Sequence, residues 1–95
     1  SRHYDLTYQE TAKQKWFETV FRHIENDHMQ YIKLCEQIYN AGYSCWDMMQ
    51  FLRTLPRFDH TQYNHFLFEF NRIKAEFKNE QLLLFYMLDY IFEKN

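Results

Sequence analysis

The side chains that most often bind metals or act as nucleophiles are few in this chain of 95 residues. They are five histidines and two cysteines: His3, His23, His28, His60, His65, Cys35 and Cys45. Two histidines that bind one metal from a single helix lie four residues apart, whereas the closely spaced pairs here are five apart. A zinc site would need both cysteines and two histidines to converge. The spacing instead predicts surface or capping histidines, two core cysteines and no metal ion.

Carboxylates are more plentiful, but no pair of them is set apart for acid–base chemistry. The acidic residues fall on predicted exposed faces or at helix caps. A single glycine leaves no glycine-rich loop to hold a phosphate, and no P-loop, serine hydrolase, zinc protease or dinucleotide-binding motif occurs. We therefore expect no catalysis and no cofactor in this chain alone.

Basic side chains gather in the second half of the chain. They are Arg53, Arg57, Arg72, Lys74 and Lys78. Arg72 and Lys78, interleaved with Phe77, could meet a nucleic acid by charge and stacking. The whole chain has a net charge of −2, which provides no basic field to hold a phosphate backbone. We favour a solvated helix face and expect no direct binding of nucleic acid.

Cysteine spacing and hydropathy predict the cellular compartment in which the protein is found. Two cysteines without a CxxC spacing, in a chain without a signal peptide, favour reduced thiols and an intracellular protein. No apolar run reaches the roughly 18 residues that span a bilayer, so we expect a soluble protein. The chain starts at Ser1 without a methionine, which suggests a C-terminal fragment of a longer polypeptide.

The composition favours helices. Aromatic residues make up 21% of the chain, and there is one glycine and one proline. Rings that each bury about 150–250 Å² can stabilise a small core, while the scarcity of turn residues disfavours strand pairing. We expect one all-α domain over residues 1–95, a compact five-helix bundle with a flexible segment at 1–6. Apolar periodicity places the helices at about 7–25, 27–41, 45–55, 60–77 and 80–92.

Capping residues set the predicted helix starts. Thr7 opens a capping box, Asn26 or Asp27 caps the second helix, and Asp59 and Asn79 cap the last two. The central junction is the most specific of these signals. Gly42 follows the last apolar position of the second helix, where a left-handed residue commonly ends a helix. Ser44 and Asp47 then form a capping-box variant, which predicts a tight helical hairpin.

The predicted buried faces follow the helical period. They comprise Tyr31, Ile32, Cys35, Ile38 and Tyr39 in the second helix, and Trp46, Met49 and Leu52 in the third. The last helix differs, because residues 82–88 are apolar on every side. Either neighbouring helices cover this segment, or it offers a second face to a partner. Because a small domain encloses a helix with difficulty, we expect a partial interface there.

The hairpin residues also carry a family resemblance. Leu34, Ile38 and Tyr39, then residues 42–44 (Gly-Tyr-Ser) and 47–49 (Asp-Met-Met), are similar to the hairpin in the C-terminal domain of replication factor C small subunits, the clamp loaders. In that family an Asn-Asp step precedes this helix pair and an Asn-Glu step opens the final helix. The corresponding steps here are residues 26–27 and 79–80. The likeness spans about residues 15 to 93.

The resemblance implies a collar domain of a clamp-loader subunit. Such collars join five subunits into a ring that loads a sliding clamp onto DNA in replication. The partners would be other clamp-loader subunits, the ATPase module would lie outside this sequence, and the location would be the nucleus or a viral replication site. Phe77-Lys78 replaces the family's small residues, and Leu83 stands where a Gln is common, as a divergent, for example viral, member would explain.

In either case we expect association with another protein. The expected interface residues are Leu83, Phe85, Tyr86, Tyr90 and Phe92 of the last helix, with Arg53 and Arg57 at the rim. Aromatic side chains concentrate binding energy at interfaces. The alternative function is a helical adaptor that binds a partner's amphipathic helix in a groove lined by tyrosines.

Overall fold

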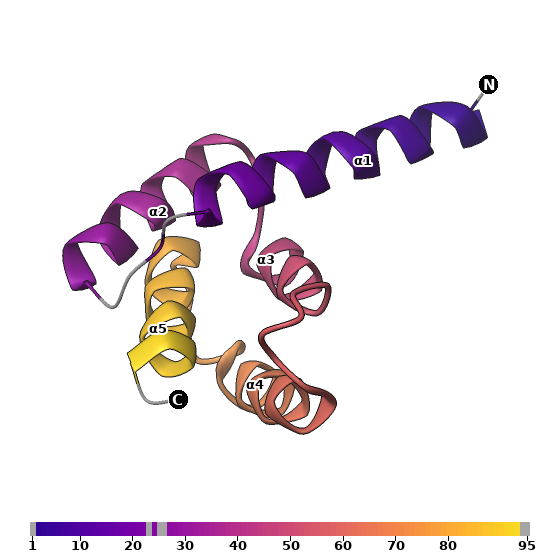
Figure 1. Ribbon diagram of the computed structural model, residues 1–95. Coiled ribbons are helices and arrows are strands. Elements are labelled where there is room, and N and C mark those ends of the chain that lie inside the picture. The colour runs from indigo at the N-terminus through magenta and orange to yellow at the C-terminus, as the bar shows by residue number, and fades with distance from the viewer. Residues whose placement is uncertain (1, 23, 25–26, 94–95) are drawn as a thin grey trace.

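The computed structural model describes residues 2–22, 24 and 27–93, with side chains from Gln9 onward. This part of the chain forms five α-helices and no strand, which confirms the predicted all-α five-helix bundle (Figure 1). The helices are α1 (Arg2–Phe21), α2 (His28–Asn40), α3 (Cys45–Leu52), α4 (His60–Ile73) and α5 (Glu80–Glu93). The molecule measures 42 × 29 × 29 Å.

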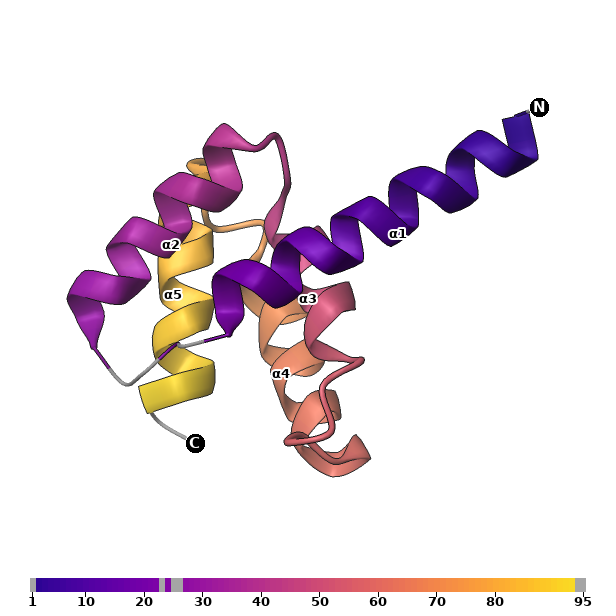
Figure 2. The same cartoon turned by 45° about the horizontal axis from the view of Figure 1, so that its top comes forward.

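Helix α1 is the outlying element. It begins at Arg2, so residues 2–6 of the segment predicted to be flexible lie in the helix, and the Thr7 capping box lies outside the described side chains. Its N-terminal half projects away from the other helices in both views (Figures 1 and 2). Its C-terminal half packs through buried Phe17 and Phe21. The end predicted near Glu25 also lies outside the described residues.

Most of the predicted caps are confirmed. Asp27 accepts a hydrogen bond from the Met29 N–H at 2.9 Å and caps α2, while Asn26 lies outside the described residues. Asp59 and Gln62 form a reciprocal capping box at the start of α4. Each cap satisfies a donor that the first helical turn leaves without an intrahelical partner. These local contacts explain why the helix starts could be read from residue type.

Asn79 caps α5 by accepting the Leu82 N–H at 3.1 Å.

Two predicted helix ends were too late. Helix α3 ends at Leu52 rather than Leu55, and α4 ends at Ile73 rather than Phe77. Phe77 keeps the apolar period of α4 but lies in the turn, where its ring packs 5.4 Å from the ring of Tyr86. An apolar residue after a helix end therefore prolongs the pattern without prolonging the helix.

The junction between α2 and α3 forms as predicted. Gly42 has a φ of 85°, and its N–H donates to the Tyr39 carbonyl at 3.0 Å. The Tyr43 N–H donates to the Ile38 carbonyl at 3.1 Å, which completes a Schellman motif. Ser44 and Asp47 then close a capping box that starts α3. The four residues 41–44 thus end one helix and begin the next.

Helix α5 is the central helix of the bundle. It contacts α2, α3 and α4, and the carboxylate of Glu80 accepts the Cys45 N–H at 2.5 Å. Its buried residues are Leu83, Leu84, Met87, Leu88, Ile91 and Phe92. The structure therefore shows the alternative in which neighbouring helices cover this segment. Leu82 is its one large apolar side chain that is exposed among the described residues.

A cluster of phenyl rings, one stacked pair and two tilted pairs, joins α1, α3 and α5. Phe17 lies 5.3 Å from Phe51, ring centroid to centroid, and Phe21 lies 5.2 Å from Phe51 and 6.3 Å from Phe92. Aromatic pairs at such distances add about 0.5–1.5 kcal/mol each beyond their buried area. This cluster holds α1 against the bundle through its last two turns.

Candidate protein-interaction surface

Two of the expected interface residues belong to the core. Leu83 is 5% exposed and Phe92 is 6% exposed, so neither offers area to a partner. The ring of Phe92 lies 6.3 Å from the ring of Tyr31, and the guanidinium of Arg57 covers it at 5.1 Å from the ring centroid. The expectation that these two residues bind a partner is therefore corrected: α5 uses them inside the bundle.

The other expected interface residues lie nearer the surface. Phe85, Tyr86 and Tyr90 are half-buried, while Arg53 and Arg57 are exposed. The hydroxyl of Tyr86 donates to the buried carboxylate of Glu69, which raises the pKa of Tyr86. The guanidinium of Arg72 donates to the same carboxylate at 2.9 and 2.6 Å. Tyr86 therefore joins α5 to α4 and is only partly free to meet a partner.

Exposed apolar side chains gather instead along α2 and the start of α5. Met29 is 62% exposed, Ile32 44%, Tyr39 51% and Leu82 58%. We call the surface formed by these four residues with Phe85 the α2/α5 seam. Helices α2 and α5 lie side by side in both ribbon views (Figures 1 and 2). The exposed apolar area expected on α5 is thus found mainly on its neighbour.

Helix α2 carries two apolar stripes rather than one. The buried stripe is Tyr31, Leu34, Cys35 and Ile38. Met29, Ile32 and Tyr39 recur at the same helical spacing on an adjoining face, which faces solvent. The prediction that Ile32 and Tyr39 point inward was therefore wrong. This short helix has more apolar residues than one face can hold. That excess was the sequence signal that could have revealed the second stripe.

The seam is hollowed beside these side chains. A groove of about 290 Å³ lies between α2 and the start of α5, with Ile32, Leu82 and Phe85 among its lining residues and Cys35, Glu36, Asn79 and Gln81 completing it. A second hollow shares Asn79 and Gln81 with the first and continues to Tyr39 and Lys78. The two hollows adjoin: the first is mainly apolar, and the second is mainly polar, with Lys78 and Glu80 among its lining residues.

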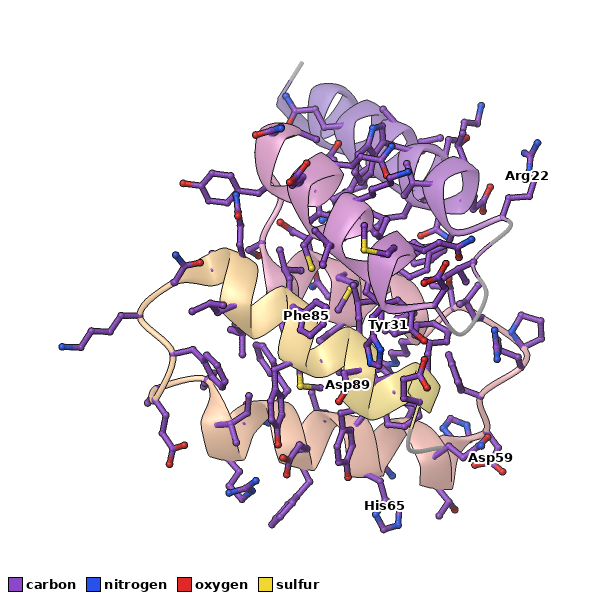
Figure 3. All side chains as sticks on the ribbon, turned by 90° about the vertical axis from the view of Figure 1, so that its left-hand side faces the viewer. Arg22, Tyr31, Asp59, His65, Phe85 and Asp89 are labelled. Atoms are coloured by element: carbon purple, nitrogen blue, oxygen red, sulfur yellow. The ribbon has the colours of Figure 1, made fainter. Side chains whose placement is uncertain are left out.

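The other end of the seam is closed by two polar contacts. His28 Nε2 lies 2.8 Å from Asp89 Oδ1, and the hydroxyl of Tyr31 donates to the Glu93 carboxylate at 2.9 Å. The ring of Phe85 lies 5.9 Å from the imidazole of His28. Figure 3 shows Tyr31, Phe85 and Asp89 close together on this side of the molecule. Because the start of α2 meets the end of α5, the two helices run in opposite directions.

The charges along the seam are unevenly placed. Glu36 is the one charged residue that lines the first hollow, and Lys33 lies three residues before it on α2. Both side chains are exposed, and neither forms an ion pair with a residue in the described part of the chain. Lys78 and Glu80, which are of opposite charge, both line the second hollow, near the end of α2. A partner on this surface would meet both signs of charge around an apolar centre.

Two other exposed aromatic residues stand apart from the seam. Phe68 is 72% exposed on α4. Trp46 was expected inside, but it is 44% exposed and lies over the ring of Phe70, 5.8 Å between centroids. Single exposed apolar residues are ordinary on soluble proteins, whereas a contiguous group adjoining a groove marks an interaction surface. The seam is therefore the stronger candidate.

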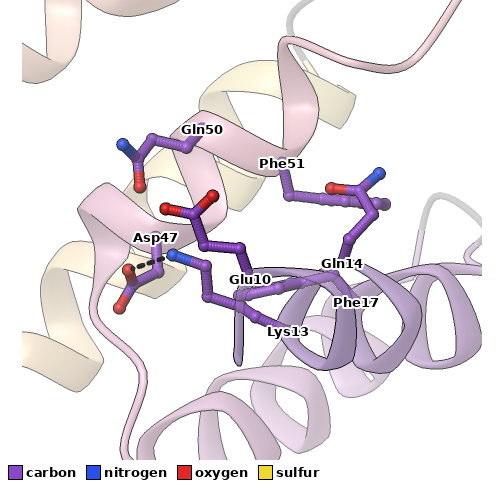
Figure 4. Close-up of a pocket in the computed structure, with 7 residues that line it drawn as sticks. All are labelled: Glu10, Lys13, Gln14, Phe17, Asp47, Gln50 and Phe51. Atoms are coloured by element: carbon purple, nitrogen blue, oxygen red, sulfur yellow. Dashed lines mark hydrogen bonds and ion pairs between the residues drawn. The ribbon is translucent and has the colours of Figure 1, made fainter. Parts of the chain in front are cut away.

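A polar notch separates α1 from α3 (Figure 4). It encloses about 250 Å³ and is lined by Glu10, Lys13, Gln14, Phe17, Asp47, Gln50 and Phe51. Lys13 Nζ lies 3.2 Å from Asp47 Oδ1. Burial opposes ionisation of Asp47, but the Ser44 N–H and the Lys13 ammonium outweigh it and lower the pKa of this carboxyl. The notch thus attaches α1 to the α3 cap.

The titratable groups elsewhere are mostly structural. Cys35 and Cys45 are free and buried, as expected for core residues, and burial raises the pKa of the Cys35 thiol to about 12. No three His, Cys, Asp or Glu side chains within the described ranges gather to hold a metal ion. Among the helices of this part of the chain, none is both long and apolar enough to cross a bilayer. His3 and His23 lie outside the described side chains.

Comparison with known proteins gives no relative: no protein-family model, no curated protein and no solved structure matches this chain.

Proposed function

We propose that this chain is a protein-association domain that binds its partner through the α2/α5 seam. One observation carries the proposal: Ile32 and Leu82, which are 44% and 58% exposed, line one groove, while exposed Tyr39 lines the adjoining hollow and exposed Met29 lies one helical turn before Ile32. Burying apolar area of this kind stabilises a complex by about 25 cal/mol per Å² before the costs of association. Aromatic and aliphatic anchors in a groove are also where binding energy concentrates.

The form that this geometry supports best is an adaptor that accepts a helix. Two antiparallel helices leave a groove between them, and the seam lines it with Ile32, Leu82 and Phe85. An amphipathic helix places apolar side chains at every third or fourth position into such a groove. The alternative stated from the sequence, a groove lined by tyrosines that docks a helix, is retained in a changed form: α2 and α5 are its walls, and, among the described side chains, Tyr39 is the one tyrosine that lines either hollow.

A clamp-loader collar is the second candidate. It is favoured by one observation, that the residues of the family resemblance build the α2–α3 junction while Asn79 begins the last helix. In that case the partner would be another clamp-loader subunit. Because Leu83 and Phe92 are buried in the core, we expect the contact with that subunit at the seam instead. The function would then be assembly of a ring in DNA replication.

One crosslinking experiment tests the proposal and separates its two forms. A photoreactive phenylalanine analogue replaces Leu82 in the chain expressed in its natural host cells, and a second chain carries the analogue at Phe68. Both positions are exposed, but only Leu82 lies on the seam. We expect a crosslinked adduct from position 82, none from position 68, and loss of the adduct when Ile32→Glu is added.

The adduct identifies the partner by mass. A protein with a P-loop ATPase module supports the collar, a different protein supports the adaptor, and twice the mass of the chain indicates a second copy. Equal adducts from positions 68 and 82, or none from position 82, would overturn the proposed function.

A further inference from the structure

We infer that the partner of the α2/α5 seam is a basic amphipathic helix, which places apolar side chains in the groove and a lysine or arginine opposite Glu36. The inference rests on the proposed function, because it names the chemistry of the partner that the seam binds. It is drawn from the charges around the groove and from the side of α2 on which each one lies.

Glu36 is the charged residue of the first hollow. It lines the mainly apolar space between α2 and the start of α5, and it forms no ion pair with any residue that the structure describes. Lys33 lies three residues earlier on α2, but it lines a separate hollow between α1 and α2. The two opposite charges therefore border different hollows, and a partner seated between α2 and α5 meets the carboxylate.

Covering the groove takes water away from this carboxylate. Glu36 is exposed in the free domain, so water solvates its charge. A partner that lays only apolar side chains over Ile32 and Leu82 would leave the charge without a counter-ion beside an apolar contact, which opposes binding. A lysine or arginine of the partner replaces the lost water with a charge-assisted hydrogen bond. The groove and its carboxylate thus select an apolar partner that also carries a cation.

The edges of the seam add to the same preference. Three further carboxylates lie at the end where α2 begins and α5 ends, those of Asp27, Asp89 and Glu93. Lys78 and Glu80, at the other end, are of opposite charge. Among the described residues of the seam, carboxylates therefore outnumber cations even when His28 is protonated. This field attracts cations and repels the phosphates of nucleic acid and of anionic lipid.

The shape of the seam favours a helical partner. The described residues contain no strand, so they offer no sheet edge to which a partner could add one. The exposed apolar residues of α2 run from Met29 to Tyr39, ten residue steps or about 15 Å at 1.5 Å per residue. An amphipathic helix of about three turns spans that length. Glu36 lies between Ile32 and Tyr39 along α2, so the basic residue of the partner lies between two apolar anchors.

Two synthetic peptides test the charge preference. Each is a helix of about four turns, or about 14 residues, with a leucine face, a fluorescent label and a side-chain bridge that keeps it helical. The lysine-faced peptide carries lysines on its polar face, and the glutamate-faced peptide carries glutamates at the same positions. Fluorescence anisotropy measures the Kd of each peptide for the complete 95-residue chain. We expect the lysine-faced peptide to bind on the order of tenfold more tightly.

A charge reversal at Glu36 separates the local contact from the net charge. Glu36→Lys should reduce the preference for the lysine-faced peptide by on the order of tenfold. Glu18→Lys makes the same change of net charge at an exposed residue of α1, and it should change the preference by less than about threefold. Leu82→Ala should weaken binding of the lysine-faced peptide, whereas Phe68→Ala, at an exposed residue of α4, should not. Far-ultraviolet circular dichroism verifies that all variants remain helical.

The inference is wrong if the two peptides bind equally, if neither binds, or if Glu36→Lys and Glu18→Lys have equal effects. A preference for the glutamate-faced peptide that depends on Lys33 would place the partner in the hollow between α1 and α2 instead. Sedimentation equilibrium of the chain alone gives a further outcome, since a dimer that Leu82→Ala weakens would assign the seam to a second copy. The proposed function fails separately, because it requires only the position-specific crosslink from Leu82 in cells.

Discussion

The contact between His28 and Asp89 is the residue-scale feature most open to pH. His28 Nε2 lies 2.8 Å from Asp89 Oδ1 at the edge of the seam. This hydrogen bond raises the pKa of His28 above its ordinary value of 6.5, desolvation opposes it, and the charges of Glu93 and Asp27 add to the rise. The folded state therefore holds the imidazolium proton more tightly than the unfolded chain.

The contact between His28 and Asp89 stabilises the folded state at low pH. Because folding raises the pKa of His28, the protonated imidazole contributes its full stabilisation below pH 6.5. This stabilisation is lost as the pH rises through the folded-state pKa of His28. We expect the urea midpoint of the wild type to fall between about pH 6 and pH 8, and to fall less in His28→Gln. Urea unfolding followed by circular dichroism at a series of pH values measures both. Parallel curves for the two proteins would contradict the role of His28.

At the scale of elements, the junction between α2 and α3 depends on the backbone of one residue. Gly42 has a φ of 85°, a region in which a side chain is strained, although no atom lies within 4 Å of the position that its Cβ would take. We expect Gly42→Ala to lower the free energy of unfolding by about 1–2 kcal/mol, through backbone strain alone. Urea unfolding curves measure the loss.

Gly42→Asn is the matched comparison for this prediction. Asparagine adds a larger side chain but tolerates the left-handed region and is used at helix ends. It should cost less than alanine because the site has room for its side chain. If asparagine destabilises more than alanine, crowding rather than backbone conformation controls the position.

Helix starts could be predicted from the sequence because each depends on a few neighbouring residues. Asp27, Ser44, Asp59 and Asn79 each accept a backbone N–H of the first turn that follows. The start of α1 at Arg2 could not be predicted this way, because Thr7 offered a plausible cap inside the helix. Helix ends at Leu52 and Ile73 were also missed, since apolar residues continue beyond both.

Which side of a helix is buried could not be predicted from one helix alone. Tyr31 and Ile32 are neighbours of similar apolar character, yet Tyr31 is fully buried and Ile32 is 44% exposed. Where α5 crosses α2 decides between them, and that position depends on the whole chain. Of the seam, only Phe85 was among the predicted interface residues; the α2 residues and Leu82 were missed for the same reason, because the interface was sought on one face of the most apolar helix.

At the scale of the molecule, α5 is the central helix of the core, and α2 carries most of the exposed apolar residues of the α2/α5 seam. A bundle of five short helices can largely enclose one of them, and the most apolar helix takes that place because its residues 82–88 are apolar on every side. The apolar excess of the chain then remains on the neighbours of α5. Association at the seam and folding around α5 are therefore separable properties of one small domain.

Two leucines of α5 test this separation. Leu84 is fully buried, whereas Leu82, two residues earlier on the same helix, is 58% exposed. We expect Leu84→Ala to lower the free energy of unfolding by about 2–5 kcal/mol, since it leaves a cavity in the core. Leu82→Ala should change the same quantity by no more than about 0.5 kcal/mol while weakening association at the seam. Urea unfolding and binding of the lysine-faced peptide measure the two effects, and equal stability losses at both positions would contradict the central placement of α5.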